Sequence, residues 1–227
     1  METVSVLRVT SAELKVSLLA ASAILCESTG PLDVVCQAKF WSLATIVKGW
    51  PEVDECTPGM NNLMLVLKPG TRNIRQLMDD LVHEWKHVEP LSAKAKEIEV
   101  PVVYGGERGV DLRSVASHAG LSVDEVVSIH SSSRYTVYFL GAHAGFGYLG
   151  GLDERLTTPR LDKPRLSVPA GTVAIGGVQT AVIAQPGPSG WNLIGRAEVD
   201  FFDPKKEPPA LLSPGDTFFF RCERIEK

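Results

Sequence analysis

The chain has 227 residues, of which 44% are hydrophobic and 22% charged, and its formal net charge is −4. This composition excludes a disordered chain, and the net negative charge argues against a protein that wraps duplex nucleic acid, which needs clustered Lys and Arg. The N-terminal residues lack the basic and apolar regions of a signal peptide, no apolar run reaches the roughly 18 residues that span a bilayer, and the four cysteines form no CxxC pair. We therefore expect a cytoplasmic protein with reduced cysteines.

Residues 1–90 predict a small domain of strands and two amphipathic helices. Strands are expected over Val4–Val9, Leu14–Ala20 and Asn62–Leu67. A first helix is expected between Pro31 and Gly49, and a second over Ile74–Val88, each with one apolar stripe. This order of elements is typical of a ferredoxin-like α/β sandwich.

The remainder of the chain changes character after a polar linker, which we place at residues 91–97. A strand over Ile98–Tyr104 is followed by a helical hairpin over Asp111–His130. Short β-type runs separated by Gly and Pro then follow: Tyr135–Leu140, Thr172–Ile175, Thr180–Ala184, Trp191–Phe202 and Asp216–Arg221. Many short strands with such turns indicate a β-barrel or sandwich over residues 98–227, and the chain as a whole is expected to be α+β.

The run His83-Glu84-Trp85-Lys86-His87 matches the HExxH pattern of zinc proteases. At 100° per residue, the apolar stripe of this helix centres near Leu81 and Trp85, whereas His83 and His87 point to the opposite side. The two histidines are therefore expected on a solvated face without a third ligand, and we predict no metal site.

Ser114–Val127 is spaced like a helix-turn-helix, with Gly120 at the turn and a capping box formed by Ser122 and Glu125. A recognition helix offers base-reading or phosphate-binding donors near its N-terminus. This one begins with Asp124 and Glu125, which a phosphate backbone repels, so we predict a structural hairpin.

Tyr104–Gly109 is a glycine-rich segment between a strand and a helix, where such loops can cradle phosphate. It lacks the Lys-Ser/Thr of a Walker loop and the full GxGxxG spacing. We interpret it as a tight turn.

Between Ile98 and Arg196 the sequence contains an ordered series of short phrases: Val100–Gly106, Asp111-Leu112, Val126–His130, Gly145-Phe146, Tyr148–Gly151, Thr158–Arg160, Pro164-Arg165, Val168–Gly171, Gly176-Gly177, Gln179-Thr180, Gly190-Trp191 and Leu193–Arg196. In these phrases the sequence resembles the KipI family, also called allophanate hydrolase subunit 1 or the 5-oxoprolinase B subunit. A further match at Pro58–Asn62 extends the resemblance into the first ninety residues.

The resemblance implies a cyclophilin-like β-barrel behind the ferredoxin-like domain. It also implies that the chain is one component of an ATP-dependent 5-oxoprolinase, which converts 5-oxo-L-proline to L-glutamate together with KipA-like and LamB/YcsF-like subunits. ATP is then used by the complex, because this chain has no P-loop. Two alternatives stay open: a protein related to subunits of allophanate hydrolase or urea carboxylase, and a KipI-type inhibitor of a sensor histidine kinase, which is a binding protein and not an enzyme.

The residues of the second half suggest an anion-binding pocket. Arginine offers planar donors for a carboxylate or phosphate, glutamine can bond an amide edge, and aromatic residues supply apolar walls. We predict His130 and Arg160 as catalytic residues, since a histidine can titrate near neutrality. The predicted substrate-binding residues are Tyr148, Arg165, Gln179, Trp191 and Arg196. Each also has a structural alternative: a loop-pinning arginine, a structural histidine or a barrel-filling tryptophan.

The segment Gly141–Tyr148 departs from the family pattern Gly-Phe-x-Pro-Gly-Phe-Pro-Tyr. An aromatic residue and two prolines are absent, which predicts a less rigid loop and a wider cavity. This departure bears on the identity of the substrate more than on the fold.

Overall fold

The structure is a computed structural model, and it describes residues 8–10, 13–30, 33–90 and 95–226. Internal contacts divide the chain into two units, residues 1–93 and 94–227. The predicted linker at 91–97 includes residues 91–94, which lie outside the described residues. Both units contain helices and antiparallel strands, so the chain is α+β.

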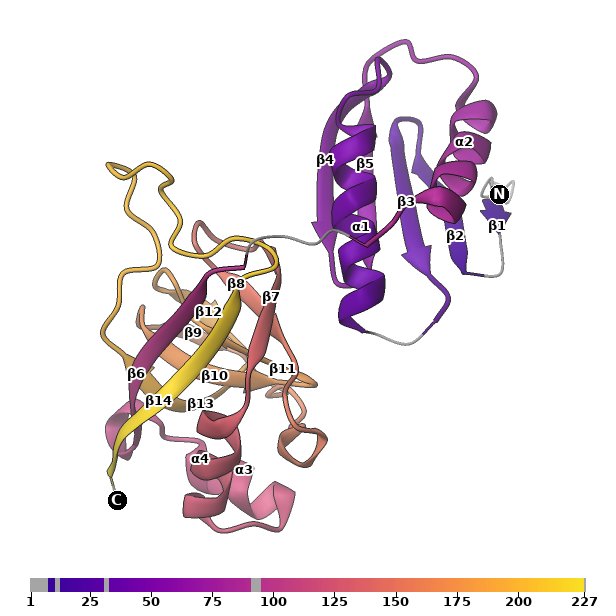
Figure 1. Ribbon diagram of the computed structural model, residues 1–227. Coiled ribbons are helices and arrows are strands. Elements are labelled where there is room, and N and C mark those ends of the chain that lie inside the picture. The colour runs from indigo at the N-terminus through magenta and orange to yellow at the C-terminus, as the bar shows by residue number, and fades with distance from the viewer. Residues whose placement is uncertain (1–7, 11–12, 31–32, 91–94, 227) are drawn as a thin grey trace. The chain divides into compact units, whose positions relative to one another are not determined.

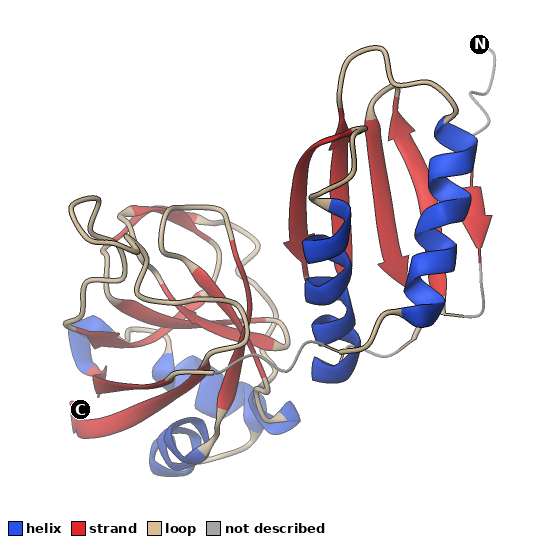
Figure 2. Cartoon of the chain, turned by 45° about the horizontal axis from the view of Figure 1, so that its top comes forward, coloured by secondary structure: helices blue, strands red, loops and turns tan. Residues whose placement is uncertain are grey.

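The first unit is a five-stranded antiparallel sheet with two helices on one face (Figures 1 and 2). The sheet order is β1-β2-β3-β5-β4. The bounds are β1 Arg8–Thr10, β2 Leu14–Ala20, β3 Ala23–Ser28, α1 Val34–Val47, β4 Val53–Gly59, β5 Asn62–Leu67 and α2 Ile74–His87. The segment from β3 to α2 follows the expected split β-α-β order, and β2, which precedes it in sequence, pairs with the outer side of β3.

Alternation and helical periodicity explain these elements. Leu14 and Val16 of β2 are fully buried, as are Leu63 and Leu65 of β5, because alternate residues of each strand face the helices. The predicted strands at Leu14–Ala20 and Asn62–Leu67 are confirmed. The predicted strand Val4–Val9 lies mainly outside the described residues, and β3 and β4 were not predicted from the sequence.

The two helices begin and pack as their sequences require. Asp33 caps α1, since its carboxylate accepts a hydrogen bond from the Cys36 backbone N–H at 2.7 Å; the predicted start at Pro31 lies outside the described residues. Phe40 of α1 packs on Trp85 of α2, with ring centroids 4.5 Å apart. The predicted apolar stripe of α2 is confirmed, because Leu77, Met78, Leu81 and Trp85 are buried.

The second unit is a closed seven-stranded barrel of order β10-β11-β8-β7-β14-β6-β13 (Figure 1). The barrel strands are β6 Glu97–Gly105, β7 Tyr135–Leu140, β8 Gly147–Gly150, β10 Thr172–Gly176, β11 Gln179–Val182, β13 Asn192–Ala197 and β14 Thr217–Glu226. Antiparallel pairing of β10 with β13 closes the barrel, and β14 runs parallel to β6. A separate two-stranded ribbon is formed by β9 Arg165–Val168 and β12 Gly187–Ser189.

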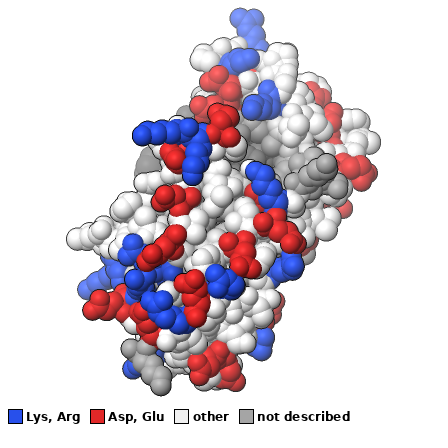
Figure 3. Space-filling view, turned by 60° about the vertical axis from the view of Figure 1, so that its left-hand side comes forward, with Lys and Arg blue, Asp and Glu red and all other residues white. Residues whose placement is uncertain are grey.

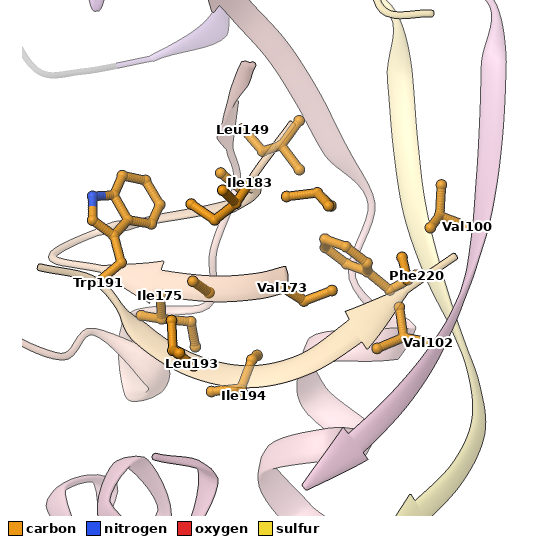
Figure 4. Close-up of a cluster of buried hydrophobic side chains, with 14 of the residues drawn as sticks. Val100, Val102, Leu149, Val173, Ile175, Ile183, Trp191, Leu193, Ile194 and Phe220 are labelled. Atoms are coloured by element: carbon orange, nitrogen blue, oxygen red, sulfur yellow. The ribbon is translucent and has the colours of Figure 1, made fainter. Parts of the chain in front are cut away.

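Buried side chains fill the barrel, as Figure 4 shows. Val100 and Val102 of β6 lie beside Phe220 of β14, whereas Trp191 lies at the opposite side of the cluster, near Ile175. These residues are at most 6% exposed. Of the two architectures expected from the short strands, the barrel is confirmed.

The helical hairpin consists of α3 Leu112–Ala119 and α4 Val123–Ser132, with the short turns η1 Gly106–Arg108 before it and η2 Glu154–Leu156 after β8. The predicted capping box is present: Ser122 and Glu125 each bond the other's backbone N–H. The hairpin's apolar residues belong to the barrel core, whereas Asp124 and Glu125 are exposed at the start of α4. The structural interpretation of the hairpin agrees with this packing.

Charges of both signs are mixed on the one face of the molecule that Figure 3 shows. On the face in Figure 3, Lys and Arg side chains alternate with Asp and Glu, without a continuous basic area. Among the described helices none is long and apolar enough to cross a membrane.

Candidate functional site

Four aromatic side chains gather where β7 and β8 meet the loop over residues 141–146. Tyr148 stacks on Phe139, its partner across the two strands, with centroids 4.2 Å apart and planes inclined by 14°. Phe146 meets Tyr148 edge-on at 4.7 Å and Trp191 at 5.9 Å. The predicted binding residues Tyr148 and Trp191 thus belong to one cluster, with centroids 6.2 Å apart.

Arg160 joins this cluster from the loop after η2. Its guanidinium carbon lies 5.3 Å from the centroid of the Trp191 ring, within the range of a cation–π contact. The loop is held by Asn192, whose side-chain amide donates to the Pro159 carbonyl at 2.8 Å, and by the Leu161 N–H, which donates to the Gly190 carbonyl at 2.7 Å. Arg160 itself is exposed. We call Arg160, Trp191 and Tyr148 the Arg160–Trp191 platform.

Gln179 lies at the same end of the barrel as Trp191, the central residue of the platform. It pairs with Gly176 across the β10–β11 turn. A Cβ at Gly176 would be 2.5 Å from the Trp191 ring, so the indole lies directly against that backbone. Gln179 is half-buried beside the platform. The sequence therefore predicted a group of residues that the fold brings to one region.

Arg165 has a different partner. Its Nη2 donates to Oδ1 of Asp111 at 2.8 Å, and Oδ2 of Asp111 accepts from the Leu193 backbone N–H at 2.7 Å. Nη1 of Arg165 is buried and has no hydrogen-bond partner among the described residues. The geometry matches the structural alternative, an arginine that pins a loop, and substrate binding by Arg165 stays a prediction.

Asp111 is a residue that the sequence analysis did not single out. It belongs to a phrase that matches the family, but nothing local indicates that a carboxylate after a glycine turn meets an arginine 54 residues later. Its side chain ties the start of α3 to β13 and to β9.

His130 lies in the barrel core with no exposed surface. Thr180 donates its single hydroxyl hydrogen to the Ala174 carbonyl, at 3.1 Å, so its oxygen accepts from His130 Nε2–H at 2.8 Å. Nδ1 then accepts from the Tyr104 hydroxyl at 2.8 Å. The ring stacks on Phe220 at 4.4 Å, and burial lowers the pKa of His130 to about 3. This neutral, fully bonded ring is arranged as a structural histidine; the catalytic prediction finds no support in its geometry.

Arg196 lies on β13, where its backbone pairs with Thr172 of β10 and Val103 of β6. Its Nε is buried and has no hydrogen-bond partner among the described residues. Its charge acts on Glu198, whose pKa is lowered chiefly by the hydrogen bond from Arg108, at 2.7 Å, and in smaller part by Arg196. Arg160, Arg165 and Arg196 thus have three different sets of contacts.

The loop before Tyr148 is tightly packed rather than open. A Cβ at Gly145, whose φ is +78°, would be 2.6 Å from the Phe201 carbonyl oxygen. A Cβ at Gly147 would be 2.5 Å from Leu212. Glycines therefore let the segment over residues 201–212 pack on this loop. Four cavities among the described residues are lined by residues other than Arg160, Trp191 and Tyr148, so none of these four is the wider cavity predicted from the loop sequence.

His83 and His87 are both exposed on α2, as the helical periodicity predicts. Their ring centroids lie 4.4 Å apart, and His87 Nδ1 is 2.8 Å from the His83 carbonyl oxygen. Among the described residues, no group of three or more His, Cys, Asp or Glu side chains is placed to hold a metal ion.

Comparison of the sequence with known proteins shows which family this chain belongs to. The profile of the carboxyltransferase domain, subdomain C and D, matches residues 14–212. The 5-oxoprolinase B subunit of Escherichia coli O157:H7 is 44% identical over 203 residues, which are 89% of this chain and 93% of the relative. The chain belongs to the family of 5-oxoprolinase B subunits. The corresponding protein of Haemophilus influenzae, also a 5-oxoprolinase B subunit, is 39% identical over 208 residues, 92% of this chain and 97% of that relative.

Solved structures agree with the fold. The crystal structure of TTHA0988 is 33% identical, with a TM-score of 0.71 over 88% of this chain, and this chain spans 39% of that longer one. The urea carboxylase of Kluyveromyces lactis has a TM-score of 0.80 over 96% of this chain, which spans 23% of that enzyme. At 18% identity this second likeness shows the fold alone.

Proposed function

We propose that this chain is the B subunit of an ATP-dependent 5-oxoprolinase that works in the cytoplasm with KipA-like and LamB/YcsF-like subunits. The complex converts 5-oxo-L-proline to L-glutamate. The observation that carries the proposal is the identity of 39% to 44% with relatives named as 5-oxoprolinase B subunits, over nearly the full length of both chains.

The chemistry explains why such a reaction needs ATP. Amide resonance makes the lactam carbonyl a poor electrophile, and transfer of a phosphoryl group to the amide oxygen creates a leaving group. Water then adds to the former carbonyl carbon and the C–N bond breaks, which leaves an acyl phosphate. A second water hydrolyses the acyl phosphate and releases phosphate and L-glutamate. The segment Gly105–Gly109 of this chain forms the short turn η1 with its two flanking glycines, and it has no P-loop lysine. We therefore assign ATP to the assembled complex.

The Arg160–Trp191 platform supplies suitable groups for the substrate. The exposed guanidinium of Arg160 is a donor for the carboxylate of 5-oxoproline. Half-buried Tyr148 offers apolar area for its ring, and the buried Trp191 positions the Arg160 guanidinium. Gln179, next to Trp191, can hydrogen-bond the lactam amide. We leave His130 out of this assignment because the barrel core encloses it.

The test is co-expression of this chain with its two proposed partners, followed by measurement of L-glutamate and ADP formed from 5-oxo-L-proline and ATP. We expect stoichiometric release of both products by the complex of all three proteins and none by this chain alone. Omission of each protein in turn serves as the control. Turnover by the isolated chain would disprove the multi-subunit proposal, and a complete complex that carboxylates urea but leaves 5-oxoproline intact would favour the alternative enzyme.

A further inference from the structure

A second region of the barrel unit has the form of a ligand site. A cavity of about 710 Å³ lies where β6 ends and the two hairpin helices begin. Its residues come from the glycine-rich turn, from α3 and α4, and from the end of β14, and none of them belongs to the Arg160–Trp191 platform. Cavities of roughly 300–1,000 Å³ with apolar walls and a few polar groups are typical of small-molecule sites.

The glycine-rich turn shapes one wall of this cavity. Gly105 and Gly106 have φ of +74° and +57°, a conformation that favours glycine. A Cβ at Gly106 would be 2.7 Å from Oε2 of Glu226, and one at Gly105 would meet the Glu226 backbone. The two glycines therefore let the turn lie directly against the end of β14, which explains a sequence feature that the platform leaves unexplained.

The remaining walls combine apolar side chains with unneutralised charges. Leu112, Val123 and Ile225 provide the apolar part. Glu226 is already paired with Arg224, whose Nη2 lies 2.9 Å from Oε1. The other charged lining residues are Glu107, Asp124 and Arg113, and none of the three has an ion pair or a hydrogen-bonded side chain among the described residues. The cavity thus offers two carboxylates and one guanidinium next to an apolar wall.

We propose that this cavity binds a zwitterionic amino acid with an apolar side chain. The ammonium group pairs with Glu107 and Asp124, the carboxylate pairs with Arg113, and the side chain packs on Leu112 and Val123. A ligand with both charges is required, because an anion alone leaves the two carboxylates unpaired and a cation alone leaves the guanidinium unpaired. The proposal does not depend on the oxoprolinase reaction, since the lining residues are separate from the platform.

Isothermal titration of the purified chain with three matched probes tests this proposal. L-leucine carries both charges, 3-methylbutylamine only the ammonium, and 4-methylpentanoate only the carboxylate, on the same branched carbon skeleton. We expect L-leucine to bind at least about tenfold more tightly than either analogue, because each analogue loses one charge-assisted contact. Equal binding of L-leucine and the amine, or no binding of any probe, would overturn the proposal.

Variants separate the two charged contacts. Asp124→Asn and Glu107→Gln should each weaken L-leucine and the amine by about tenfold, and Arg113→Gln should weaken L-leucine while leaving the amine unchanged. Glu107 lies in the turn, so its variant remains informative if Asp124→Asn disturbs α4. Glu154→Gln is the control, since Glu154 is an exposed carboxylate outside the cavity. Leucine binding that none of the three cavity variants weakens would place the ligand elsewhere.

Discussion

Asp111 binds Arg165 through one carboxylate oxygen, 2.8 Å from Nη2, while its other oxygen accepts the backbone N–H of Leu193. One half-exposed arginine is thereby fixed to the barrel by a carboxylate that is itself nearly buried. This arrangement changes what is expected of Arg165, which the sequence alone placed among the substrate-binding residues.

Asp111→Ala should lower the free energy of unfolding by about 2–4 kcal/mol, because it leaves the Leu193 N–H and the Arg165 guanidinium without their acceptor. Arg165→Ala should cost about 1–3 kcal/mol. The double variant should cost less than the sum of the two by at least about 0.5 kcal/mol, since both remove one interaction. Urea unfolding of the four proteins measures this coupling. An Arg165→Ala protein of unchanged stability whose assembled complex is inactive would instead support substrate binding by Arg165.

Arg160→Ala should have the opposite profile. Its guanidinium is exposed and contacts only the face of Trp191 among the interactions described, so stability should change by no more than about 0.5–1 kcal/mol. If it binds the substrate carboxylate, turnover by the assembled complex should fall by about 10- to 150-fold. Arg155→Ala is a matched control, because Arg155 is also exposed and its one ion-pair partner among the described residues is Asp153. Full activity of the Arg160→Ala complex would remove the platform from the site.

His130 should make stability depend on pH. The pKa of a histidine in an unfolded chain is about 6.5, whereas burial lowers that of His130 to about 3. Between these two pKa values the unfolded state binds a proton on His130 that the folded state does not bind. The stabilising contribution of the neutral His130 is therefore complete above the pKa of the unfolded state and is lost as the pH falls below that pKa. Between about pH 7.5 and 5.5 the wild type should lose about 1 kcal/mol more than His130→Gln.

Urea unfolding at the two pH values checks this prediction, and NMR checks its premise directly. The imidazole resonances of His130 should stay constant across this range. Titration of His130 near neutrality would contradict the neutral core assignment and restore it as a candidate for proton transfer.

Gly176→Ala should disturb the platform without touching a charged residue. The new Cβ would be 2.5 Å from the Trp191 ring, so the indole must move. We expect a loss of about 1–3 kcal/mol in stability and a changed indole resonance for Trp191. Gly190→Ala, adjacent to Trp191, places its Cβ no closer than 3.6 Å to its neighbours and is the control. Equal effects of both substitutions would show that glycine flexibility, not the close approach, matters at Gly176.

Local patterns predicted the elements whose causes are local. The apolar stripe of α2 and the capping box of Ser122 and Glu125 depend on residues three or four positions apart, and both are present. Strands β3 and β4 were not predicted, because pairing with β5 places each of them and local patterns do not show that pairing. The exposed, charged β4 is an edge strand without a buried run of its own, and its place depends on pairing with β5.

The site was predictable only in part. The family phrases contained Tyr148, Trp191 and Arg160, which the fold gathers in one cluster. Arg165 bonds Asp111, 54 positions away, and His130 bonds Thr180, 50 positions away. No spacing rule could therefore distinguish an arginine that binds substrate from one that pins a loop. Residue type indicates which chemistry a side chain can perform, whereas long-range contacts decide whether it is free to do so.

The parallel pairing of β14 with β6 joins residues about 120 positions apart along the chain, from Thr217 with Glu97 to Glu226 with Gly105. During synthesis the apolar side chains of β6 therefore leave the ribosome long before the strand that covers them. The described strands of the first unit all lie before Pro69, so that sheet can form while the barrel is still incomplete. A nascent chain that pauses before β14 exposes an unpaired strand edge on β6, so we expect the barrel half of the protein to be the part more prone to aggregate during synthesis.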